Sequence, residues 1–115
     1  MSVHIKRIYE HWSSDDGYRV LVDRLWPRGI KKDAAQIDEW LKDVAPSSSL
    51  RTWFNHEPEK WKSFVLKYAA EIKDSQALIK LQALIKKHKK VTLLYSAKDE
   101  EHNQAIALLQ LLKLH

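Results

Sequence analysis

Arginine and tryptophan side chains suited to holding an anion gather in the run Asp-Arg-Leu-Trp-Pro-Arg-Gly, which begins at Asp23. The guanidinium groups of Arg24 and Arg28 can each bind a phosphate or a carboxylate through two hydrogen bonds, and the face of Trp26 can stack on a base or a sugar. Arg51 is a further candidate for the same cluster. The structural alternative is that Asp23 pairs with an arginine inside the protein while Trp26 fills the rim of the core.

A second candidate segment runs from Tyr95 to Asp99 and links a short apolar run to a predicted helix. In open α/β sheets, ligands bind at the carboxyl ends of strands, where the start of the following helix offers free N–H groups to an anion. Ser96 and Asn103 are candidates for hydrogen bonds to such a ligand. Asp99 is the expected cap of the helix, either alone or beside a binding site. The segment has no glycine, so it cannot wrap a phosphate as a P-loop does.

Two residues are candidates for moving a proton at this site, His56 and Tyr95. An imidazole can exchange a proton near neutral pH, although His56 could equally cap the helix that begins near Pro58. Asp99 and His102 are three residues apart on the predicted helix, a spacing compatible with two metal ligands, but no third ligand is evident. We therefore expect neither a metal ion nor another cofactor.

Composition predicts one folded domain spanning residues 1–115, because 44% of the residues are hydrophobic and 30% are charged. The absence of cysteine excludes disulfides, thiolate catalysis and zinc sites built on cysteine. No apolar run approaches the roughly 20 residues that cross a bilayer, and the N-terminus lacks the residue order of a secretion signal. These features predict a cytoplasmic protein without a membrane partner.

The charge balance favours anionic partners such as phosphates, nucleotides or nucleic acid. The formal net charge is +5 and the isoelectric point is about 9.4. The densest basic cluster, from Lys86 to Lys90, fits the C-terminus of a helix, where cations complement the helix dipole, better than it fits a nucleic-acid contact.

Hydrophobic periodicity indicates an α/β domain. Alternating or continuous apolar residues predict strands at residues 3–9, 18–25 and 91–95. Helical spacing predicts helices at residues 50–54, 58–72, 77–87 and about 100–114, and residues 47–49 offer serine caps for the first of these. Residues 33–44 fit either a helix capped by Asp33 or a short turn followed by a third strand through Trp40 to Val44. We assign three tryptophans to the core: Trp40, Trp53 and Trp61.

The order of these elements predicts the fold class. Strands come first, helices fill the middle, and a helix–strand–helix unit ends the chain. This order is typical of a three-layer α/β sandwich with a mostly parallel sheet, here of about four strands.

Three segments, residues 22–29, residues 45–56, and residues 93–99 together with 103–105, resemble the YeaO-like family of bacterial proteins, a domain of unknown function. The resemblance extends over nearly the whole chain, and the run Asp-Arg-Leu-Trp-Pro-Arg-Gly is its most specific part. It implies a small cytoplasmic α/β protein. It implies no settled activity, substrate or cofactor, so no functional residue is carried over from the family.

The first hypothesis for function is a domain that binds or acts on a small anionic, phosphate-bearing ligand at the carboxyl edge of the sheet. In this hypothesis the cluster of arginines binds the anion and the helix start from Asp99 to Glu101 supplies backbone N–H donors. His56 or Tyr95 donates or accepts a proton. The sequence does not decide whether such a domain is an enzyme, nor does it indicate an oligomeric state.

The alternative hypothesis is a nucleic-acid-binding module with Trp26 as its stacking platform. It predicts a continuous basic face and an affinity that falls steeply as salt rises. A structural or adaptor role is a third hypothesis, and it requires an exposed apolar patch.

Overall fold

The strand β4 (Lys90–Tyr95) lies at the centre of a parallel sheet. A computed structural model, which describes residues 2–113, places β1 (Ser2–Arg7) on one side of β4 and β2 (Tyr18–Leu21) on the other. The short β3 (Glu39–Trp40) pairs with β2 at the far edge, and every strand pair is parallel. The prediction of an α/β domain with a mostly parallel sheet of about four strands is confirmed.

Both faces of β4 are buried, because its alternate residues enter two separate apolar clusters. Val91, Leu93 and Tyr95 pack in the larger cluster, between the sheet and the long helices. Leu94 packs with Leu21 in a smaller cluster on the opposite face. This alternation explains why the sequence of β4 is almost uniformly apolar, as a strand buried on both faces requires.

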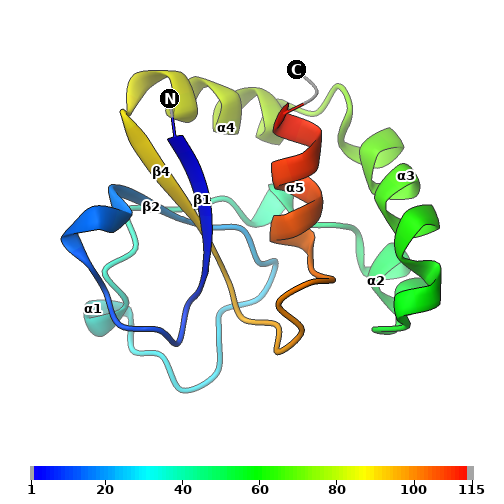
Figure 1. The fold of residues 1–115 in the computed structure, drawn as a ribbon, viewed down its shortest axis with the longest axis horizontal. Coiled ribbons are helices and arrows are strands. Elements are labelled where there is room, and N and C mark those ends of the chain that lie inside the picture. The colour runs from blue at the N-terminus through cyan, green and yellow to red at the C-terminus, as the bar shows by residue number, and fades with distance from the viewer. Residues whose placement is uncertain (1, 114–115) are drawn as a thin grey trace.

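In the described part of the chain, four helices pack against the larger cluster (Figure 1). They are α2 (Ser48–Phe54), α3 (Trp61–Ile72), α4 (Gln76–Lys87) and α5 (Gln104–Lys113). The opposite face is covered by loop residues on either side of the one-turn helix α1 (Lys32–Ala35). Three layers result, of which the one made by α1 and the loops is thin.

Serine caps set the beginnings of two helices, as the sequence predicts for α2. The Ser47 side chain accepts a hydrogen bond of 3.1 Å from the Leu50 N–H at the start of α2, and Ser75 accepts one of 3.1 Å from the Leu78 N–H at the start of α4. Each cap satisfies a backbone donor that the helix itself leaves free. Within residues 2–113, no helix is both long enough and apolar enough to span a bilayer.

The second strand is shorter than the predicted range of residues 18–25, because its partner ends. Leu21 pairs with Leu94, the Val22 N–H donates to the Leu94 carbonyl at 3.0 Å, and β4 stops at Tyr95. Without a neighbouring strand the chain leaves the sheet at Asp23. Residues 23–25 therefore belong to the loop that follows β2.

Residues 33–44 follow the second of the two predicted alternatives in part: a turn leads to a strand, but the strand covers only Glu39–Trp40 and residues 42–44 form a single 3-10 turn. The helix α1 ends after one turn, because Gln36 adopts a left-handed conformation with φ of 50°. The Leu41 N–H then donates to the Leu21 carbonyl at 2.9 Å, which draws the chain to the edge of the sheet. The prediction that Asp33 caps a helix is wrong, since Lys31 occupies that position without a side-chain hydrogen bond.

The three tryptophans assigned to the core have different environments. Trp40 and Trp61 are partly buried and pack against the smaller and the larger cluster, respectively. Trp53 is 37% exposed, with the Lys60 and Lys67 ammonium groups 5.0 and 4.9 Å from its ring. The prediction for Trp53 is therefore wrong: its ring lies at the surface under two lysines, whose cations are attracted to the aromatic face.

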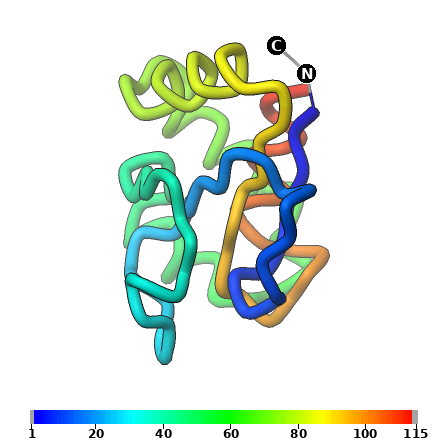
Figure 2. Tube along the Cα trace, turned by 90° about the vertical axis from the view of Figure 1, so that its left-hand side faces the viewer, coloured from blue at the N-terminus to red at the C-terminus, as the bar shows by residue number. Residues whose placement is uncertain are grey.

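The parallel strands bring three loops to one end of the molecule. In Figures 1 and 2 the loop after β2 (blue to cyan) and the loop after β4 (orange) both lie at the lower end, where β1 also ends. This arrangement follows from the parallel pairing, because the carboxyl ends of neighbouring parallel strands meet at the same edge of the sheet.

We expect Gly17→Ala to destabilise the domain far more than Gly29→Ala. Both glycines have positive φ angles, 68° and 76°, which strain any L side chain. A Cβ at Gly17 would also lie 2.9 Å from the Cβ of Lys90 at the start of β4, whereas nothing lies within 4 Å of a Cβ at Gly29. The expected losses in the free energy of unfolding, measured by urea denaturation, are about 1 kcal/mol for Gly29→Ala and about 3 kcal/mol or more for Gly17→Ala. Equal losses would contradict a tight contact between residue 17 and β4.

Candidate functional site

A cavity of about 1130 Å³ opens at the carboxyl end of the sheet. Its wall is formed by segments that are far apart in the sequence, within residues 7–9, 23–28, 45–56 and 96–104, together with Phe64 of α3. The first, second and fourth of these segments come from the ends of β1, β2 and β4, and the third contains α2. The cavity is large enough for a small organic ligand.

All but one of the residues predicted from the sequence line this cavity. They are Arg24, Trp26, Arg28, Arg51, His56, Ser96, Asp99 and Asn103. The exception is Tyr95, which is 3% exposed and packs in the larger apolar cluster. Burial, with the nearby charges of Glu100 and Glu10, raises the pKa of the Tyr95 phenol, so this group stays protonated at neutral pH.

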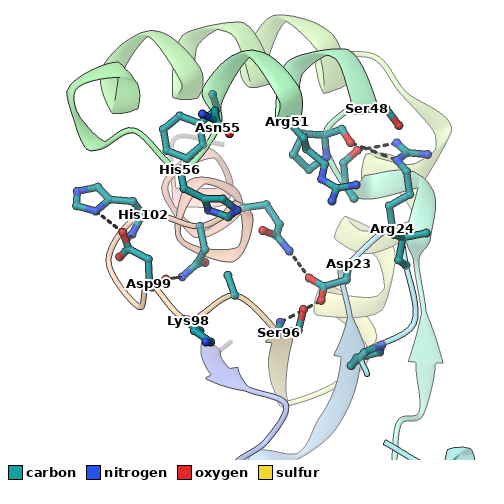
Figure 3. A pocket seen from close by; sticks show the side chains of 18 of the residues that line it. Asp23, Arg24, Ser48, Arg51, Asn55, His56, Ser96, Lys98, Asp99 and His102 are labelled. Atoms are coloured by element: carbon teal, nitrogen blue, oxygen red, sulfur yellow. Dashed lines mark hydrogen bonds and ion pairs between the residues drawn. The ribbon is translucent and has the colours of Figure 1, made fainter. Parts of the chain in front are cut away.

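The guanidinium group of Arg24 holds the chain that enters α2. Its Nε donates to the Pro46 carbonyl at 3.2 Å and one terminal nitrogen donates to the Ala45 carbonyl at 3.1 Å, as Figure 3 shows. An arginine has five N–H donors, so Arg24 keeps donors for a ligand while these two bonds restrict its orientation.

Arg28 and Arg51 are more exposed than Arg24. Among the described residues, neither guanidinium group forms an ion pair or donates a hydrogen bond. Figure 3 shows the Arg51 side chain extending from α2 on the side of the cavity where Asp23 lies. These two groups can reorient toward an anion without breaking an existing contact.

Asp23 is the buried carboxylate of the cavity, with an exposed fraction of 6%. It accepts a hydrogen bond of 3.0 Å from the Ser96 N–H through one oxygen and a short hydrogen bond from the Gln104 side-chain amide through the other (Figure 3). No ion pair reaches it within residues 2–113, so the predicted pairing of Asp23 with an arginine is not a direct contact. Asp23 instead joins the ends of β2 and β4 to the start of α5.

Burial raises the pKa of Asp23 above its ordinary value, because the charged form loses contact with water. Hydrogen bonds from Ser96, the positive charge of Arg51 and the hydrogen bond from Gln104 act in the opposite direction but are outweighed. The site therefore holds a carboxylate whose ionisation is made costly by the fold. Such groups concentrate at functional sites.

The helix after β4 begins later than predicted, which changes the role of Asp99. α5 starts at Gln104, and the Asn103 side-chain oxygen accepts the Ile106 N–H at 3.0 Å as its cap. Asp99 instead closes the preceding turn by accepting the N–H groups of Glu101 and His102 at 2.9 and 3.0 Å. The prediction of Asp99 as helix cap is wrong. The predicted donors at Glu101 are already used by the protein's own carboxylate.

Asp99 also pairs with the imidazole of His102, whose Nδ1 lies 3.0 Å from a carboxylate oxygen. The N–H of Glu101, followed by the side chain and the N–H of His102, lowers the pKa of Asp99 below its usual value. The His102 ring meets the edge of Trp61 at 5.3 Å between centroids. Among residues 2–113, no three histidine, aspartate or glutamate side chains are placed to share a metal ion.

His56 lies at the rim of the cavity in an unusual backbone conformation. Asn55 ends α2 with φ of 47°, and His56 follows with φ of 54°, so two consecutive residues are left-handed. His56 does not cap the turn that begins at Pro58, because Glu57 occupies that position and makes no side-chain capping bond. The structure thus contradicts the capping alternative for His56 and leaves its exposed ring beside the cavity (Figure 3).

Trp26 lines the cavity, but its ring has other partners. Its indole N–H donates to the Ile30 carbonyl at 2.7 Å, and its ring meets Trp40 edge to face at 5.4 Å. The Lys32 ammonium group lies 5.9 Å from the same ring. Trp26 is therefore anchored by the smaller apolar cluster, as the structural alternative for this residue predicts, while one part of it reaches the cavity.

Sequence reasoning missed several residues that line the cavity. Arg7 ends β1, donates from Nε to the Ala97 carbonyl at 3.0 Å and stacks over the ring of Tyr9 at 4.7 Å. Lys98 and Gln104 come from the loop after β4 and the start of α5. The sequence did contain a signal for Arg7, because the last residue of a strand parallel to β4 must lie at the edge of the sheet where β4 ends.

We expect the stability of Asp23→Asn, relative to the wild type, to rise with pH. Because the folded protein holds the Asp23 proton more tightly than an unfolded chain, whose aspartate pKa is near 3.8, the wild type loses stability as pH rises from that value through the raised pKa. Asparagine does not titrate, so it avoids this loss.

Melting temperatures measured from about pH 3.5 to 8 check this expectation. The exposed Asp43 serves as a matched control, because Asp43→Asn makes the same chemical change outside the cavity. A stability difference between Asp23→Asn and the wild type that stays constant over this range would contradict the raised pKa.

Comparison with known proteins agrees with the family resemblance seen in the sequence. Residues 2–115 match a family described as the "Inactive DUF488-N3 subclade". The chain is 44% identical over 108 residues to the Escherichia coli (strain K12) protein named "Uncharacterized protein YeaO", and the match covers 94% of each chain. It is also 44% identical over 110 residues to "Uncharacterized protein Rv3073c" of Mycobacterium tuberculosis, covering 96% of this chain and 92% of the relative. No solved structure matches. The resemblance noted in the sequence is therefore confirmed, and the chain belongs to the YeaO-like bacterial family.

Proposed function

We propose that this domain binds a small anionic, phosphate-bearing ligand in the cavity at the carboxyl end of the sheet. The observation that carries the proposal is the charge of the lining side chains. Five cations line the cavity: Arg7, Arg24, Arg28, Arg51 and Lys98. Against them stand two carboxylates, Asp23 and Asp99, and both accept hydrogen bonds from the protein itself. This imbalance attracts anions.

The arginines can contribute to anion binding in two different ways. Arg28 and Arg51 are free to form paired hydrogen bonds to phosphate oxygens, which is the geometry that guanidinium groups favour. Arg24, oriented by the carbonyls of Ala45 and Pro46, offers its remaining donors from a restricted position. A restricted donor loses less conformational entropy when the ligand binds.

Binding without turnover is the form of this function that we favour. The matched family is described as an inactive subclade. The phenol of Tyr95, one of the two candidates for moving a proton, is buried outside the cavity lining. His56 remains beside the cavity, where its ring can donate a hydrogen bond to the anion.

Two features speak against the nucleic-acid alternative. The basic cluster from Lys86 to Lys90 precedes and begins β4, whereas the cavity lies beyond the other end of that strand. The six residues of β4 separate the two basic regions by roughly 20 Å. The ring of Trp26, proposed as a stacking platform, is anchored to Trp40 and Ile30.

We expect inorganic phosphate or pyrophosphate to raise the melting temperature of the wild type. At about 100 times its dissociation constant, a ligand adds about 2.7 kcal/mol to the free energy of unfolding. Arg28→Gln and Arg51→Gln should each weaken binding by about tenfold or more, because each removes charge-assisted hydrogen bonds. Lys89→Gln removes an exposed positive charge outside the cavity and should bind like the wild type.

Short oligonucleotides at low and high salt complete this experiment. A melting shift caused only by oligonucleotides, and abolished by salt, would favour the nucleic-acid alternative. Anion binding that survives in the double variant of Arg28 and Arg51 would contradict the proposed site.

A further inference from the structure

We propose that the ligand of this cavity carries hydroxyl groups as well as its anionic group, as a sugar phosphate does, and that Asp23 accepts hydrogen bonds from those hydroxyls. This inference rests on the proposed function and names the chemical class of its ligand. It assigns to Asp23 a role in recognition in addition to its contacts within the fold.

The first argument is the unused hydrogen-bonding capacity of Asp23. An ionised carboxylate can accept about four hydrogen bonds. Within the described residues, the Ser96 N–H donates to one oxygen and the Gln104 side-chain amide donates to the other, and the Ser96 hydroxyl also stabilises the charged form, which leaves acceptor capacity for at least one more donor. No cation forms an ion pair with either oxygen in residues 2–113. Asp23 lines the cavity, so a ligand there can supply the missing donors.

The second argument is the sign of the charge on Asp23. A buried carboxylate lowers the affinity of a site for a bare anion, because like charges repel strongly where water is excluded. The carboxylate becomes favourable only when the bound molecule presents N–H or O–H donors to it. Burial already makes its charge costly, as the raised pKa of Asp23 shows, and a ligand that donates hydrogen bonds offsets that cost.

The third argument decides between the two kinds of donor. A ligand ammonium group would sit among the lining cations, and the charge of Arg51 is close enough to Asp23 to act on its ionisation. Repulsion from these cations disfavours a second positive charge. A hydroxyl is neutral, donates to a carboxylate and avoids this repulsion.

The fourth argument is the size of the cavity. Its volume of about 1130 Å³ slightly exceeds the range of roughly 300–1,000 Å³ typical of pockets for small organic ligands and is far beyond what one phosphate group fills. Figure 3 shows Asp23 on the opposite side of the cavity from His102, with Arg51 above it. An anion held by the arginines therefore leaves room for the rest of the molecule.

The test compares three probes by isothermal titration calorimetry: inorganic phosphate, propyl phosphate and ribose 5-phosphate. Propyl phosphate has a carbon chain but no hydroxyl, so it separates the effect of size from the effect of hydrogen bonding. We expect ribose 5-phosphate to bind the wild type about tenfold or more tightly than propyl phosphate, because hydrogen bonds to a charged group are strong.

Asp23→Asn removes the charge and keeps nearly the same shape. The two probes without hydroxyls should bind this variant more tightly than they bind the wild type, because the repulsion is gone. The preference for ribose 5-phosphate should shrink to about threefold or less, since a neutral acceptor binds a hydroxyl more weakly. Asp43→Asn, outside the cavity, should keep the affinities of the wild type. A merely structural role of Asp23 would weaken all three probes together.

Each other outcome has a distinct meaning. If phosphate binds and ribose 5-phosphate binds the wild type no better than propyl phosphate, this inference is overturned while the proposed anion site stands. That comparison needs no variant, so it holds even where Asp23→Asn fails to fold. If Asp23→Asn keeps the full preference for ribose 5-phosphate, Asp23 is not the acceptor. If none of the three probes binds, both the anion site and this inference are wrong.

Discussion

The parallel pairing of β4 with β1 on one side and β2 on the other is the constraint on which the site depends. Val91 of β4 aligns with Val3 and Tyr18, and Leu93 aligns with Ile5 and Val20, so one central strand sets the register of both neighbours. Because all three strands run the same way, the chain leaves each of them at the same edge of the sheet. The loops that follow them have to share that space, and the cavity lies among them.

The contacts of Asp23 close this edge of the sheet. The Asp23 carboxylate joins the end of β2 to the loop after β4 and to the first residue of α5. Arg24, the next residue, binds the carbonyls that lead into α2. Two adjacent side chains therefore hold three separate segments around one cavity. Because these contacts hold the loops in place, the binding residues on the loops keep their positions relative to one another.

The electrostatics of the cavity combine two opposing features. Its cations exceed its carboxylates, yet the most deeply buried ionisable group in its wall is the acid Asp23. Asp99 differs from Asp23 in that it is stabilised as a carboxylate by the N–H of Glu101 and by His102. Asp99 thus accepts three hydrogen bonds within its own loop, whereas Asp23 lines the cavity with acceptor capacity that the protein does not use.

The sequence alone determined the fold class, the strands β1 and β4, the helices α2 to α4 and the family, because each depends on local periodicity, on serine caps or on a specific run of residues. It also indicated most of the cavity wall, since residues after strands of a parallel sheet converge. Tertiary structure decided the rest. The length of β2 depended on where β4 ends, and the start of α5 depended on Asn103 rather than Asp99 as cap. The role of Asp23 was decided by partners more than 70 residues away, which no local pattern encodes.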